Sequence, residues 1–161
     1  MSPDAQFTHA HMTRFERPLP AARDKVWGLL TDTSLLPGWY GEGRLEPRVG
    51  GAVNFLNGHI KGVVTQYVPQ KKLAYTWNVF MPGQIVSDYP ESYLTLELDD
   101  SKLTLTHLPV QESFVKVNAM GWHTFLDMVD AAARGEQVEP REAYIKRNAA
   151  RYGIDLPKLP G

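Results

Sequence analysis

Six aromatic side chains and one histidine carry the chemistry most typical of a ligand-binding site. Period-two alternation places the histidine on the same strand face as Leu103 and Leu105, pointing inward. Histidine changes its charge near neutral pH, so this one could hold or protonate a ligand. The alternative is a core histidine that is hydrogen-bonded within the protein. The candidate ligand-binding residues are Trp39, Phe55, Tyr75, Trp77, His107, Trp122 and Phe125.

The six aromatic rings have two interpretations. They could line a cavity for a small apolar ligand, and such cavities typically measure about 300–1,000 Å³. They could equally fill the core, which aromatic rings do well. In the first case the Tyr75 hydroxyl and the Trp77 indole N–H could orient a ligand carbonyl or hydroxyl, although backbone carbonyls would satisfy these donors too.

Other polar residues give no pattern that predicts catalysis, a metal or a cofactor. His9 and His11 share a strand face as a metal pair would, but no third ligand has suitable spacing. His59 and His123 have no partner that spacing identifies, and the carboxylates, Asp127 and Asp130 among them, are expected to be solvated rather than paired for acid–base work. No glycine-rich segment precedes a helix as in a phosphate-binding loop. We therefore predict no catalytic residue, no metal site and no cofactor.

Composition points to one ordinary globular domain. The 161 residues include 17 Lys and Arg against 18 Asp and Glu, so the net charge is −1 and a nucleic-acid partner is not expected. There is no cysteine, and so no disulfide framework or thiolate metal site. No apolar run is long enough for a membrane span, and no secretory signal pattern is found, so a cytoplasmic protein without membrane contact is expected.

The order of elements predicts an α+β fold. Period-two segments indicate an antiparallel meander, and a 3.6-residue repeat of apolar side chains indicates a long helix that must cover the sheet. We expect strands over residues 7–17, 44–49, 52–56, 60–68, 72–79, 92–98 and 102–108, and helices over 20–31, 34–36, 113–134 and 140–152. Ser34 is the expected cap of the second short helix.

The chain is expected to divide into a domain over residues 1–135 and an extension over 136–161. The helix of the extension is amphipathic, with a basic face and a stripe that includes Tyr144, Ile145 and Tyr152. That stripe is expected to pack on its own domain or on a twin subunit, which leaves a homodimer open. The loop between residues 80 and 91 could cap the mouth of a cavity.

The order of motifs resembles a known superfamily. The motifs are Arg-Phe-Glu-Arg-Pro-Leu-Pro (14–20), Leu-Pro-Gly-Trp-Tyr-Gly (36–41), Leu-Ala-Tyr-Thr-Trp (73–77), Leu-Thr-Leu-Thr-His (103–107) and Gly-Trp-His-Thr-Phe-Leu (121–126). Together they are similar to the START-like, Bet v 1-like (SRPBCC) superfamily, and within it to the activator of Hsp90 ATPase homologue family. The resemblance implies a helix-grip fold: an antiparallel sheet of six to seven strands, curved around a long C-terminal helix, with two short helices after the first strand. The extension adds a further helix.

The resemblance also implies a function class. Such folds commonly keep a cavity between sheet and helix, so a hydrophobic small-molecule binding protein without assigned catalysis is the leading hypothesis. Two alternatives stay open: an enzyme similar to polyketide cyclases and aromatases or to self-sacrificing resistance proteins, and a co-chaperone that activates a chaperone ATPase. Most of the matching residues are packing residues, so the motifs predict fold better than chemistry.

Overall fold

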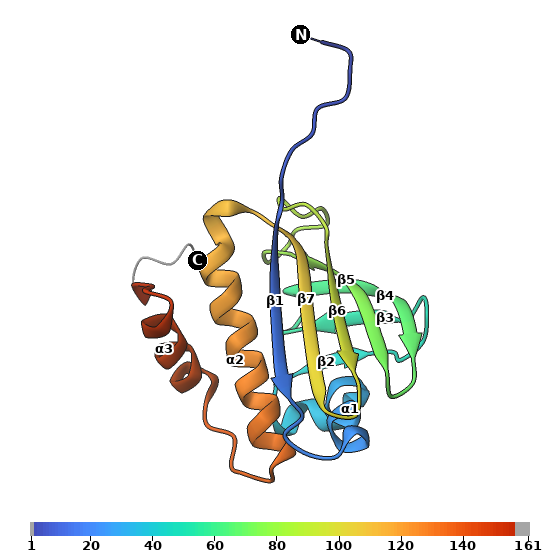
Figure 1. The fold of residues 1–161 in the computed structure, drawn as a ribbon, viewed down its shortest axis with the longest axis vertical. Helices are drawn as coiled ribbons and strands as arrows, with labels where there is room; N and C mark the ends of the chain where they lie inside the picture. Colours follow the sequence, from blue (N-terminus) through green and yellow to red (C-terminus); the bar gives the residue numbers. More distant parts are fainter. Residues whose placement is uncertain (1, 157–161) are drawn as a thin grey trace.

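The computed structural model describes residues 2–156 and shows a curved sheet with helices stacked on one side (Figure 1). In chain order the elements are β1 (His11–Pro18), α1 (Arg23–Thr31), the 3₁₀ helix η1 (Thr33–Gly38), β2 (Gly43–Leu45), β3 (Ala52–Phe55), β4 (Ile60–Val68), β5 (Lys72–Val79), β6 (Ser92–Leu98), β7 (Lys102–Val110), the 3₁₀ helix η2 (Glu112–Phe114), α2 (Val115–Ala133) and α3 (Arg141–Arg151). The predicted α+β helix-grip class is confirmed.

All seven strands form one antiparallel sheet in the order β1-β7-β6-β5-β4-β3-β2. The chain runs as a meander from β2 to β7, and β1 joins the β7 edge. The tight β6–β7 hairpin turns on Asp99, whose Oδ1 accepts the backbone N–H of Ser101 and of Lys102, both at 2.8 Å. The strand alternation that the sequence shows is therefore real, with one face directed at the helix and the other at solvent.

The core lies between this sheet and α2. Leu73, Leu94 and Leu105 come from three neighbouring strands and are fully buried, as are Leu126 and Val129 on the facing side of the helix. Their burial holds the 19-residue helix across the sheet, because the apolar surfaces of the sheet and the helix shield each other from water.

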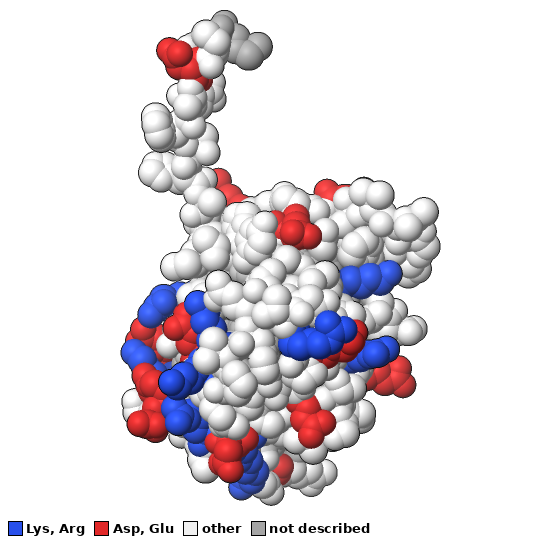
Figure 2. Space-filling view, turned by 90° about the vertical axis from the view of Figure 1, so that its right-hand side faces the viewer, with Lys and Arg blue, Asp and Glu red and all other residues white. Residues whose placement is uncertain are grey.

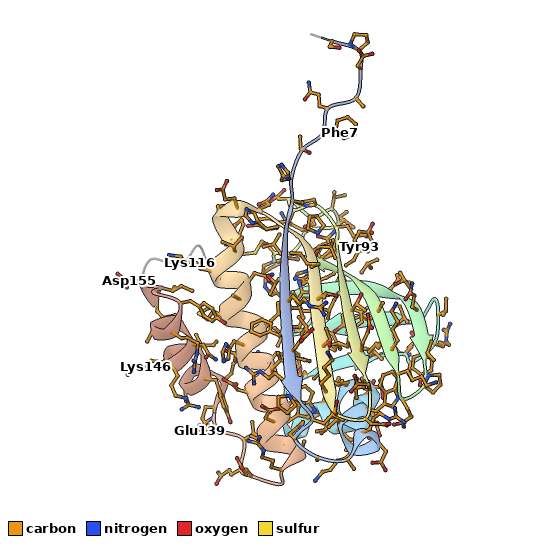
Figure 3. All side chains as sticks on the ribbon, in the orientation of Figure 1. Phe7, Tyr93, Lys116, Glu139, Lys146 and Asp155 are labelled. Atoms are coloured by element: carbon orange, nitrogen blue, oxygen red, sulfur yellow. The ribbon has the colours of Figure 1, made fainter. Side chains whose placement is uncertain are left out.

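A third layer is formed by α3, which packs on the side of α2 that faces away from the sheet (Figure 1). Its Tyr144, Asn148 and Ala149 are buried, while Lys146 lies on its outer face (Figure 3). Asn148 donates hydrogen bonds from Nδ2 to Thr124 Oγ1 and to Asp127 Oδ2, both at 3.1 Å. The extension helix thus packs on its own domain.

An ion pair ties the edge strand β1 to α2, and it corrects the expectation that Asp127 and Asp130 are simply solvated. Arg17 Nη1 lies 2.9 Å from Asp127 Oδ1 and 3.1 Å from Asp130 Oδ2, and the Arg17 side chain is only 17% exposed. His123 also has partners that spacing did not identify. Its Nδ1 is 2.8 Å from the Tyr152 hydroxyl, and its ring packs edge-on against Phe15.

Several predicted boundaries were wrong, each for a local reason. β1 begins at His11, which pairs with Val110, the last residue of its partner strand β7. The residues before His11 therefore have no strand to pair with. β2 ends at Leu45, since Pro47 has no N–H to donate. Asp32, and not Ser34, caps η1: its carboxylate accepts the Ser34 N–H at 2.9 Å.

Residues 2–10 extend away from the body as an exposed arm (Figures 1 and 3). Phe7 on this arm is 97% exposed. Figure 2 shows basic and acidic side chains interspersed on the face it presents, which therefore carries no field of a single sign. No helix within residues 2–156 is long and apolar enough to cross a membrane. The last part of the predicted extension, residues 157–161, lies outside the described residues.

Candidate ligand-binding site

A continuous cluster of aromatic rings fills the middle of the layer between the sheet and α2. The six aromatic residues predicted from the sequence all belong to it, joined by Tyr40. Ring centroids lie 4.7 Å apart for Trp77 and Trp122, 5.3 Å for Trp122 and Phe125, and 5.3 Å for Trp39 and Phe125. We call this set the aromatic cluster: Trp39, Tyr40, Phe55, Tyr75, Trp77, Trp122 and Phe125.

Two cavities share Trp77 as part of their walls. The first, of about 220 Å³, lies between α2, α3 and the segments around residues 40 and 56, and we call it the helix-side cavity. It is lined by Tyr40, Leu56, Trp77, Val117, Asn118, Met120, Gly121, Trp122, Thr124, Phe125, Met128, Arg141 and Ile145.

The second cavity, of about 280 Å³, lies under the loop that joins β5 to β6, and we call it the loop-side cavity. It is lined by His59, Trp77, Asn78, Val79, Met81, Tyr89, Pro90, Ser92, His107, Pro109, Val110, Gln111, Phe114, Val117 and Asn118. Trp77, Val117 and Asn118 line both cavities, so these residues form the partition between the two spaces.

The predicted ligand residues divide between cavity wall and core. Trp77 lines both cavities, and His107 lines the loop-side cavity. Trp122 and Phe125 line the helix-side cavity. The other three predicted residues are buried in the core and line neither cavity: Trp39, Phe55 and Tyr75. Some of the predicted rings therefore fill the core, and others border open space.

His107 is 3% exposed and is held by three side chains. Its Nδ1 accepts hydrogen bonds from Trp122 Nε1 at 2.9 Å and from Asn118 Nδ2 at 3.0 Å, so this nitrogen carries no hydrogen. The proton therefore sits on Nε2, which donates to Ser92 Oγ at 2.7 Å. Ser92 in turn donates to the Trp77 carbonyl at 3.1 Å.

This arrangement keeps the imidazole neutral. Burial lowers the pKa of His107 to about 4. A general base for chemistry near neutral pH needs a pKa close to the working pH and a free nitrogen. His107 has neither. Its role in this geometry is to fix Trp122 and Asn118 at the cavity walls.

Residues of the loop from Phe80 to Glu91 line the loop-side cavity, at the position where the sequence analysis left a capping loop open. Met81, Tyr89 and Pro90 line the cavity, and the Tyr89 ring packs edge-on against Phe114 at 5.8 Å between centroids. His59 Nδ1 donates to the Phe80 carbonyl at 3.0 Å, which anchors the start of the loop to the β3–β4 turn. Ile85 and Val86 at the loop tip are 93% and 80% exposed.

Sequence reasoning missed the cavity residues supplied by contacts between distant segments. Ser92 and Asn118 carry the polar contacts of His107, yet both are common residue types without a distinctive spacing. Tyr40 and Arg141 meet across the chain: the guanidinium stacks 4.7 Å from the centre of the Tyr40 ring and donates to the Tyr40 carbonyl. Tyr40 stands beside Trp39 in a motif that the sequence did single out, whereas Arg141 was expected only as part of the basic face of its helix.

Metal-ligating side chains do not gather near these cavities. Within residues 2–156 there is no group of three or more His, Cys, Asp or Glu side chains placed to hold a metal ion. His9 and His11, the only pair with suitable sequence spacing, are exposed at the base of the arm.

Comparison with known proteins identifies a matching family and solved structures with a similar fold. The family described as "Activator of Hsp90 ATPase homolog 1-like protein" matches residues 20–134. Among solved structures, CalU16 from Micromonospora echinospora is 22% identical with a TM-score of 0.67, and the match covers 92% of this chain and 97% of that one. No curated protein matches the chain.

Two further solved structures share the fold. A protein in the dynemicin biosynthetic locus, DynU16, is 20% identical with a TM-score of 0.67, covering 81% of this chain and 50% of that one. An HSP90 activator from Plasmodium falciparum is 19% identical with a TM-score of 0.61, covering 75% of this chain and 94% of that one. These similarities establish the helix-grip architecture.

Proposed function

The chain belongs to the Activator of Hsp90 ATPase homolog 1-like family, and from that premise we propose that it binds a small apolar molecule between its sheet and α2. The observation that carries this proposal is the pair of cavities beside Trp77, in a layer that is otherwise filled by aromatic rings. Both cavities border the core and are partly open to solvent, so a small molecule can reach their aromatic walls from the surface.

The size and lining of the cavities limit the ligand. Each cavity is slightly smaller than the lower end of the range for drug-sized ligands, about 300 Å³. One cavity therefore suits a molecule of one or two rings. Aromatic walls favour a flat apolar body, and the free hydrogen on Asn118 Nδ2, which donates only one hydrogen to His107, could hold a polar group.

The structure favours binding over catalysis at this site. His107 is neutral, and both of its nitrogens are used within the protein. The lining carboxylates needed for acid–base work are missing from both cavities within the described residues. A ligand in either cavity would meet mostly apolar walls and a hydrogen-bond donor, but no activated nucleophile or base.

A larger side chain in the wall shared by the two cavities tests the proposal. Val117 lines both cavities, so Val117→Phe should occupy the space beside Trp77 and weaken binding of uncharged aromatic probes at least tenfold. We suggest 3-phenylpropanol, indole and 2-naphthol as probes, with affinity measured by ligand-observed NMR. Each contains one or two rings, as the cavity volumes require.

Val63→Phe is the matched control, because Val63 is 48% exposed on β4 and lines neither cavity. Gly121→Leu is a second filling variant, since an added Cβ there meets no atom within 4 Å and the residue lines the helix-side cavity. Both filled variants should melt cooperatively. If the wild-type protein binds none of the probes, or if Val117→Phe binds them as tightly as wild type, the proposal is wrong.

A further inference from the structure

The helix-side cavity has a cation at its wall that pairs with no carboxylate. Arg141, the first residue of α3, lines the cavity, stacks on the Tyr40 ring and donates to the Tyr40 carbonyl. No salt bridge joins its guanidinium to a carboxylate of residues 2–156. By contrast, Arg147 on the same helix pairs with Glu139 at 2.7 Å.

A buried hydrogen-bond donor without an acceptor lies behind the cavity wall. Trp39 Nε1 is buried and forms no hydrogen bond within the described part of the chain. The Trp39 ring contacts Tyr40 at 5.5 Å and Phe125 at 5.3 Å, both of which line the cavity. Buried donors left unpaired in a native structure call for an explanation, such as a bound group that supplies acceptors.

The phenols stay protonated and so remain donors. Burial raises the pKa of Tyr40, and burial with the nearby Tyr40 raises the pKa of Tyr75 well above its ordinary value. The remaining wall is mostly apolar, with Leu56, Val117, Met120 and Met128 among its residues, and Asn118 and Thr124 are its polar members. The site therefore offers the positive charge of Arg141 together with largely hydrocarbon contacts.

From this geometry we infer that the helix-side cavity selects an apolar monocarboxylate, whose carboxylate lies against Arg141 and the Tyr40 hydroxyl and whose hydrocarbon body lies along α2 beside Trp77. A carboxylate accepts several hydrogen bonds and matches the planar guanidinium in charge and shape. The inference rests on the proposed ligand-binding function and adds a chemical class to it. It also gives α3 a role, because the selecting cation comes from the extension helix (Figure 1).

The test compares an acid with the matching alcohol. We expect wild-type protein to bind 3-phenylpropionate at least tenfold more tightly than 3-phenylpropanol, since a hydrogen bond to a charged group is worth more than a neutral one. Arg141→Met should bring the two affinities within about twofold, because a charge-assisted contact of that strength is removed. Arg141→Lys should keep part of the preference, and Tyr40→Phe should lower it severalfold.

Arg147→Met is the matched control, because it removes one positive charge from the same helix while leaving the cavity wall intact. It should preserve the preference for the acid. Equal wild-type affinities for acid and alcohol would overturn the inference, as would equal effects of Arg141→Met and Arg147→Met. In those cases alcohol binding still supports the proposed function. If neither compound binds, the proposed function fails together with the inference.

Discussion

His107 is the residue whose surroundings predict a pH dependence of stability. Its pKa is lowered by burial to about 4 in the folded protein, against about 6.5 in an unfolded chain. Below pH 6.5 the unfolded state gains a proton that the folded state does not. The contribution of His107 to the free energy of unfolding should therefore be fully present above pH 6.5 and decrease until about pH 4. At about 1.4 kcal/mol for each pH unit, the loss is of order 3 kcal/mol.

The measurement is urea unfolding of wild type and His107→Gln at pH 7, 5.5 and 4.5. The variant should begin less stable and then lose less stability on acidification. Burial also lowers the pKa of His123, so only the difference between the two proteins isolates His107. His9→Gln, on the exposed arm, should follow wild type. If the free energies of unfolding of wild type and His107→Gln changed with pH in parallel, His107 would be protonated equally in the folded and unfolded states.

Alternation along β7 was enough to predict that His107 points inward, because the period of two assigns every second residue to the core face. Its hydrogen-bond partners were beyond reach. Asn118 and Trp122 approach it from α2 and Ser92 from β6, and the sequence gives no measure of how far the helix slides along the sheet. Arg141 was missed for the same reason, since its cavity position depends on how α3 packs.

Among the elements, β1 and α2 depend on the Arg17 ion pair. Removing the cation in Arg17→Met leaves two neighbouring carboxylates without their partner, and we expect a loss of about 1–3 kcal/mol at pH 7, below the value for a fully buried pair. Burial already raises the pKa of Asp130, and Arg17 opposes that rise. Without Arg17 the pKa rises further, so protonation should reduce the deficit as pH falls toward 4.

Arg14→Met is the control on the same strand, because Arg14 and its partner Glu16 are about half exposed. Such a surface pair contributes about 0–1 kcal/mol, so this variant should unfold close to wild type at both pH values. Chemical unfolding at pH 7 and 4.5 measures both changes. An Arg17→Met deficit that matches Arg14→Met, or that grows on acidification, would contradict the assigned role of this ion pair.

Elements with strong periodicity were predicted closely. The limits of β4 and β5 agree with the sequence analysis, and α2 differs only because its first turn is the 3₁₀ helix η2. Both strands lie between turn residues, so local chemistry determines their ends. Boundaries failed at β1 and β2, the two edge strands, whose length depends on where a neighbouring strand stops.

In the whole molecule, the arm and the body are structurally independent. Apart from the hydrogen bond between Asp4 N and Ser2 Oγ, residues 2–10 form no side-chain hydrogen bond or ion pair, and all are exposed. Removing residues 1–9 should therefore change the free energy of unfolding by less than about 0.5 kcal/mol, as for other exposed changes. Thermal melts of both forms provide the measurement, and a clear drop in melting temperature would show that the arm contacts the body.

Trp77 stands between the two cavities together with Val117 and Asn118, and its ring is held less firmly than the neighbouring ring of Trp122. Trp122 is fixed by its hydrogen bond to His107, whereas the Trp77 indole N–H has no partner within residues 2–156. Trp77 is thus the movable member of the partition. A ligand that occupies one cavity can enter and leave without moving the Trp77 ring. A longer ligand that extends into both cavities must rotate this ring. The residence time of a ligand, and not its affinity alone, should then distinguish a ligand in one cavity from one that reaches both.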